Sequence, residues 1–116
     1  MQYDRAHALA QDIRQSEEYQ TYHRLREEVN SDETTAALLK EHKKLSAALQ
    51  MMALAGQQPP AEDMQRFQGL TTVLFANPAV SQYMMAEMRL QQMLGDILKI
   101  ITEAADLDIP LPGIDG

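Results

Sequence analysis

Apolar side chains recur along the chain at intervals of three and four residues, with polar side chains between them. This spacing places the apolar residues on one face of an α-helix, and the segments that show it are rich in strong helix formers such as Ala, Leu, Met, Gln and Glu. Glycine and proline interrupt the pattern mainly at GQQPP (56–60) and PLPGIDG (110–116). The chain is therefore expected to be all-α.

Five helices are predicted. Four of them are expected at about 3–15, 17–29, 32–55 and 78–105, and the fourth in chain order has Pro60 in its first turn and a buried face from Met64 to Leu74. Ser16 is the expected N-cap of the second helix, Gly56 the left-handed residue after the third, and Asn77-Pro78 the start of the fifth. The helices at 32–55 and 78–105 would each be about 35–42 Å long, so we expect an elongated antiparallel helical bundle. Residues 1–105 form a single domain in this prediction. Residues 106–116 form an extended or flexible tail, because Pro110 and Pro112 exclude a helix there.

The composition excludes several classes of protein. The chain of 116 residues has a formal net charge of −7 and no cysteine, so it has no disulfide scaffold, zinc ribbon, thiol nucleophile or cysteine-ligated cluster of its own. An acidic chain without the usual Lys/Arg footprint is not expected to bind nucleic acid directly. No apolar run approaches the ~18 residues of a membrane span, and the N-terminus lacks the apolar core of a signal peptide. A cytoplasmic protein without membrane contact is expected.

Glu87 is the most unusual residue of the fifth helix, because it lies in the middle of the apolar stripe between Tyr83 and Leu90. A buried carboxylate needs a cation or a hydrogen-bond donor. We expect Glu87 to be a structural polar clamp to the second or third helix. A contact with a partner protein and a catalytic carboxylate are the alternatives.

The chain has eight methionines, and three of its apolar positions suggest an interface. Met85, Met93 and Ile100 lie away from the Glu87 stripe, and a long helix with two apolar sides needs two partners. A homo-oligomer interface is the main interpretation of these three residues. The alternatives are a groove for a different protein and simple exposure. Four other methionines are expected to fill the core: Met52, Met64, Met84 and Met88.

No catalytic, metal or cofactor site is predicted. The three histidines are dispersed, and no phosphate-binding, nucleophile-elbow or dinucleotide motif occurs. A helical-bundle metal site would need Glu-x-x-His pairs on facing helices, and the chain offers only Asp4 before His7 at that spacing. We therefore expect no enzyme activity and no cofactor.

Short motifs follow one another in a fixed order over residues 3–104. They are Tyr3-Asp4-x-Ala6-x-x-Leu9-Ala10, Ser16-Glu17-Glu18-Tyr19-x-x-Tyr22, Val29-Asn30-Ser31-Asp32, Leu45 to Gln50, Asn77-Pro78-x-Val80-x-x-Tyr83 and Ala86-Glu87-x-x-Leu90. In order and spacing they resemble the bacterial YlbF/YmcA-like regulator family, which also includes the YheA proteins.

The resemblance implies an all-helical fold, assembly with itself or with a related regulator subunit, and regulatory work without known catalysis. Relatives of this kind promote competence, sporulation and biofilm formation and modulate an endoribonuclease that processes RNA. Some carry a C-terminal cysteine motif linked to an iron–sulfur cluster, which this chain lacks. The expected function is that of a protein–protein adaptor or regulator. The alternatives are a YheA-like structural homo-oligomer of unassigned role and a small enzyme.

Overall fold

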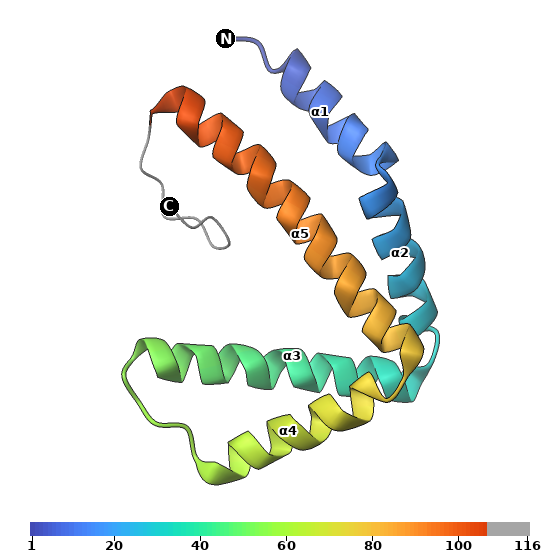
Figure 1. Cartoon of the computed structure of the whole chain (residues 1–116), viewed down its shortest axis with the longest axis vertical. Helices are drawn as coiled ribbons and strands as arrows, with labels where there is room; N and C mark the ends of the chain where they lie inside the picture. The colour runs from blue at the N-terminus through green and yellow to red at the C-terminus, as the bar shows by residue number, and fades with distance from the viewer. Residues whose placement is uncertain (107–116) are drawn as a thin grey trace. The chain divides into compact units, whose positions relative to one another are not determined.

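The structure is a computed structural model that describes residues 1–106 as five α-helices (Figure 1). They are α1 (Asp4–Gln15), α2 (Glu17–Asn30), α3 (Glu33–Leu54), α4 (Ala61–Phe75) and α5 (Pro78–Ala105). The all-α prediction, the number of helices and the two long helices, of 22 and 28 residues, are confirmed. The tail predicted at 106–116 lies outside the described residues, except for Asp106.

Local side-chain chemistry sets the helix boundaries. The Ser16 hydroxyl accepts a hydrogen bond from the Tyr19 amide at 3.1 Å, and the Asn77 side chain accepts one from the Ala79 amide at 3.0 Å. Each bond satisfies an amide that has no partner within the first turn of its helix. The predicted caps of α2 and α5 are therefore confirmed.

The end of α3 is a Schellman motif. Gly56 has a φ of 72°, and its amide donates to the Ala53 carbonyl at 3.1 Å. The Gln57 amide donates to the Met52 carbonyl at 2.9 Å. This pair of bonds requires a left-handed residue after the helix, which glycine adopts without a steric cost. The prediction for Gly56 is confirmed.

The helices group into two compact units. The first combines Met1–Leu25 with the part of the chain that starts at Tyr83, and the second is Arg26–Gln82. Both boundaries fall inside helices, one in α2 and the other in α5. The single domain expected at 1–105 stays a prediction.

In the first unit, α2 packs against α5 through aromatic rings. The rings of Tyr22 and Tyr83 are stacked, with centroids 5.5 Å apart and planes inclined by 26°. Leu25, Tyr83 and Ala86 are buried in this unit. The helix α1 contributes no fully buried residue, although Ile13 is half-buried. The contact between α2 and α5 is therefore the best-packed part of the unit.

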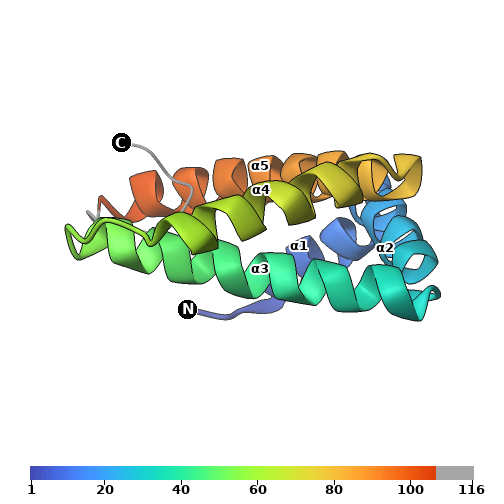
Figure 2. The ribbon, with the colours of Figure 1, turned by 90° about the horizontal axis from the view of Figure 1, so that it is seen from below.

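In the second unit, α3 and α4 run antiparallel beside each other (Figures 1 and 2). The His42 ring stacks on Phe67 with centroids 4.7 Å apart, and Glu41 forms an ion pair with Arg66. The buried residues of this unit are Val29, Thr35, Leu39, His42, Leu74 and Val80. In the described part of the chain, no helix combines the length and the apolar character needed to cross a lipid bilayer.

Candidate functional site

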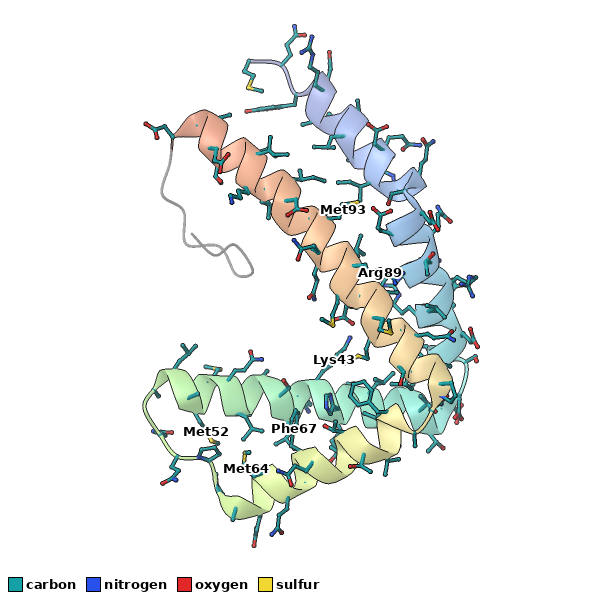
Figure 3. All side chains as sticks on the ribbon, in the orientation of Figure 1. Lys43, Met52, Met64, Phe67, Arg89 and Met93 are labelled. Atoms are coloured by element: carbon teal, nitrogen blue, oxygen red, sulfur yellow. The ribbon has the colours of Figure 1, made fainter. Side chains whose placement is uncertain are left out.

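The exposed apolar surface of α5 is the main candidate for a functional site. Met85 is 55% exposed and Ile100 is 67% exposed, as a surface role requires. Met93 is half-buried and lies on the side of α5 that faces α1 (Figure 3). The three residues predicted as one interface thus lie in two environments, and their role in an interface stays a prediction.

The position of Met93 follows from the geometry of a straight helix. Ala86, Met93 and Ile100 are seven residues apart, and such a row rotates by about 20° per heptad around an α-helix. Exposure rises along the row, from 4% at Ala86 through half-buried Met93 to 67% at Ile100. Ala86, at the start of the row, therefore lies against α2, whereas Ile100, at its end, is exposed to solvent.

Met88 belongs to the exposed surface, although the sequence pattern placed it in the core. It is 68% exposed, and Met64 on α4 is 39% exposed, so the prediction of core filler was wrong for both. Met52 and Met84 are half-buried. The error has a physical cause: a helix in a unit of few helices buries a narrow stripe, and a methionine just beside that stripe remains in solvent.

Glu87 is half-buried on α5. Its Oε1 accepts a hydrogen bond from Gln91 Nε2 at 3.3 Å, one turn further along the same helix. The clamp to the second or third helix stays a prediction.

His42 joins α3 to α4, a contact that the sequence pattern did not predict. The Thr71 hydroxyl donates its single hydrogen to the Phe67 carbonyl at 2.8 Å, so Thr71 Oγ1 must accept from His42 Nε2, 3.0 Å away. Neutral His42 therefore carries its proton on Nε2. Burial lowers the pKa of His42 below its usual value, because the charged ring would lose its hydration. The imidazole is a structural link.

A hollow of about 250 Å³ lies in the first unit. Its lining residues are Glu17, Glu18, Thr21, Ala86 and Arg89. Arg89 lies on the side of α5 that faces α2 (Figure 3). The two glutamates belong to the first turn of α2, where the positive end of the helix dipole favours carboxylates. This placement explains the glutamates as parts of the helix start. In residues 1–106, no three metal-binding side chains gather at one place.

Sequence reasoning also missed a local basic surface on α3. Lys40, Lys43 and Lys44 lie within five residues of one another, and all three are exposed. The segment KEHKK already contains the three lysines, but the negative net charge of the whole chain led to the prediction that no basic surface is present.

A solved structure shares this fold. The solved structure of a protein of unknown function (DUF964) from Bacillus stearothermophilus superposes with a TM-score of 0.71, covering 87% of this chain and 89% of that one. At 21% identity, this match supports the fold alone.

Sequence comparison gives nearer relatives. A UPF0342 protein of Symbiobacterium thermophilum is 33% identical over 93% of this chain and 96% of its own length. A UPF0342 protein of Alkalihalophilus pseudofirmus is 36% identical over 87% of this chain and 86% of its own length. The model of the family described as control of competence regulator ComK, YlbF/YmcA, matches residues 2–105. That description names a regulator and no enzymatic reaction. The chain belongs to the YlbF/YmcA family.

Proposed function

We propose that this chain is a non-enzymatic, cytoplasmic regulatory protein that acts by protein–protein interaction and assembles with a second copy of itself through α5. The observation that carries the proposal is the exposure of large apolar side chains on this helix, at Met85, Met88 and Ile100. Exposed apolar residues that cluster on one element are typical of interaction sites. Methionine is suited to this role because its flexible side chain adapts to a partner surface.

The family description supports the regulatory part of the proposal. By that resemblance, the regulated processes include competence, sporulation, biofilm formation and endoribonuclease-dependent RNA processing. A related regulator subunit is the second candidate partner. A structural homo-oligomer is the second candidate function, because the same exposed apolar side chains of α5 would also serve an assembly without a regulatory partner.

The test of self-association is the mass of the protein in solution. Size-exclusion chromatography with light scattering should give an oligomer for the wild type and a folded monomer for the double variant Met85→Glu/Ile100→Lys. Val73→Glu is the matched control, because Val73 is 58% exposed on α4 and a charge there should leave the mass unchanged. A wild-type monomer at every concentration would refute self-association.

The adaptor role needs a separate test. Co-purification of a related regulator subunit from its native host should be lost in Met85→Glu/Ile100→Lys and kept in Val73→Glu. If the subunit co-purifies equally with both variants, then α5 is not the surface that it contacts. If no protein co-purifies with the wild type, the structural homo-oligomer becomes the better function.

A further inference from the structure

The solvent-facing side of α3 carries two lysines followed by two large apolar side chains. Lys40 and Lys44 are exposed, Met51 is 71% exposed and Leu54 is 89% exposed. With 3.6 residues per turn, these four positions fall within an arc of about 80° around the helix. They form one continuous surface, here named the α3 stripe.

The α3 stripe is basic in an acidic protein. Helix α3 contains three lysines against Glu33 and Glu41, so its net charge is +1 (three positive minus two negative), whereas the whole chain carries −7. Glu41 is held by Arg66 on α4. Within residues 1–106, neither Lys40 nor Lys44 has an ion-pair partner. A partner surface that suits the stripe must therefore offer apolar side chains at one end and a carboxylate at the other.

Helix α5 offers such a surface. Met85 is 55% exposed, Met88 is 68% exposed, and Gln92 and Asp96 are exposed one and two turns after Met88. The Gln92 amide donates to Asp96 at 3.1 Å and holds that carboxylate on the same side of the helix. These four positions also fall within an arc of about 80°. They are here named the α5 stripe.

The spacings of the two stripes match when the helices run antiparallel. At 1.5 Å per residue, Met51 and Leu54 are about 4.5 Å apart along α3, as are Met88 and Met85 along α5. The basic group at Lys44 is about 10.5 Å from Met51, and the acidic group at Asp96 is about 12 Å from Met88. The apolar ends and the opposite charges therefore meet in one register.

We infer that the α3 stripe of one copy packs antiparallel on the α5 stripe of a second copy. In this arrangement Leu54 meets Met85, Met51 meets Met88, and Lys44 meets Asp96. The inference rests on the proposed self-association and names the surfaces that make it. Burial of the apolar ends supplies the affinity, and the charged pair sets the direction. A parallel pairing that matches the apolar ends would place Lys44 opposite Pro78, at the start of α5, and Asp96 beyond the last residue of α3, so the opposite charges would not meet.

One pair of like charges occurs in this register, and the carboxylates beside it on α5 offset the repulsion. Lys99 falls opposite Lys40 of the other copy. Asp96 and Glu103 lie three and four residues from Lys99 on the same side of α5, so this part of the helix carries a net charge of −1 (one positive minus two negative). The basic end of the α3 stripe thus still meets an acidic surface.

The absence of cysteine from the chain makes a direct test simple. Met51→Cys and Met88→Cys are made as separate single variants at exposed positions, mixed, and oxidised. A disulfide requires Cα atoms within about 7 Å, so only facing positions link. We expect a mixed Met51→Cys/Met88→Cys disulfide dimer as the main product. Val73→Cys mixed with Met88→Cys is the control and should link much less. A predominant link between two copies of Met88→Cys would mean that α5 pairs with α5, and would overturn the inference.

A complementation experiment tests the same arrangement without a covalent bond. Met51→Glu/Leu54→Glu removes the α3 stripe, and Met85→Glu/Met88→Glu removes the α5 stripe. Each variant alone should be a folded monomer, checked by circular dichroism, while an equimolar mixture should form a heterodimer through the one intact pair of stripes. Because this heterodimer has one pair of stripes in place of two, the mixture is examined up to the highest concentration at which the protein stays in solution. Failure of the folded variants to associate even there would overturn the inference.

The two proposals fail in different ways. A wild-type protein that is monomeric at every concentration refutes self-association, and the stripe pairing with it. A wild-type oligomer that gives neither the mixed disulfide nor the heterodimer refutes the stripe pairing alone.

Discussion

The link between His42 and Thr71 allows a sharp prediction about stability. Thr71→Val keeps the branched shape of the side chain and removes the oxygen that accepts from His42 Nε2 at 3.0 Å. His42 is 8% exposed, so water cannot easily take the place of the hydroxyl. A shift of the imidazole proton to Nδ1 would not help, because the Nε2 lone pair would then face the valine methyl group. Either tautomer leaves one buried nitrogen without its partner.

The expected cost follows from that unsatisfied group. A buried donor or acceptor left without a partner destabilises a protein by about 1–3 kcal/mol. Domains of this size unfold with a total free energy of about 5–15 kcal/mol, so the loss is a large fraction. At roughly 4 °C per kcal/mol, the melting temperature should fall by about 4–12 °C.

Thr72→Val is the matched control for this prediction. The Thr72 hydroxyl donates to the Gln68 carbonyl at 2.9 Å, the same contact with the preceding turn that Thr71 makes with Phe67, but Thr72 is exposed and has no histidine partner. Its replacement should change the free energy of unfolding by less than about 0.5 kcal/mol. Thermal melts followed by circular dichroism measure both variants. Equal melting temperatures for the two variants would refute the argument that the histidine link contributes to stability.

Two further predictions concern His42 and Glu87. The pKa of His42 is lowered in the folded state and is about 6.5 in the unfolded chain, so the unfolded state binds more protons between these values. The stabilising effect of neutral His42 is therefore complete above about pH 6.5 and decreases as the pH falls below it. His42→Gln, which keeps a donor for Thr71, should flatten this part of the curve of unfolding free energy against pH, measured by urea titration; an unchanged slope would contradict the assignment. Glu87→Ala should lower the melting temperature, and Glu87→Gln should lower it less. The loss of unfolding free energy in Glu87→Ala should be below the ~3–5 kcal/mol of a fully buried pair, because Glu87 is half-buried. A melting temperature that Glu87→Ala leaves unaltered would reject the clamp and favour a contact with a partner.

The sequence predicted the fold well wherever the cause was local. Ser16, Gly56 and Asn77 act on amides and carbonyls within a few residues, and these short contacts have strong sequence signatures. The apolar period located all five helices to within a few residues. These features depend little on how the helices later pack.

Features that depend on the register between helices could not be predicted in the same way. The His42 contact requires Thr71, which is 29 residues further along the chain, to face His42 from α4. The burial of Met93 and the exposure of Met88 depend on which side of α5 meets the other helices of its unit. Periodicity shows that a helix has an apolar side, but it does not give the width of the side that packing covers. The interface on α5 therefore stays a prediction, and packing decides which of its methionines reach solvent: Met93 is half-buried and Met88 is exposed.

The magnitudes favour an assembly that needs both pairs of stripes. Full burial of one large apolar side chain stabilises by about 1.5–3 kcal/mol, and the four apolar residues of one pair of stripes are between 55% and 89% exposed. One pair of stripes should therefore contribute about 4–8 kcal/mol. Association costs roughly 4–15 kcal/mol in lost translational and rotational freedom, so a single pair is marginal. Two pairs, related by a two-fold axis, would contribute about twice as much, which is larger than most of the range of that association cost.

It follows that the heterodimer of the complementation experiment, which has one pair of stripes, should dissociate at a much higher concentration than the wild-type assembly. Sedimentation equilibrium compares the two, and equal dissociation constants would show that the second pair of stripes does not form.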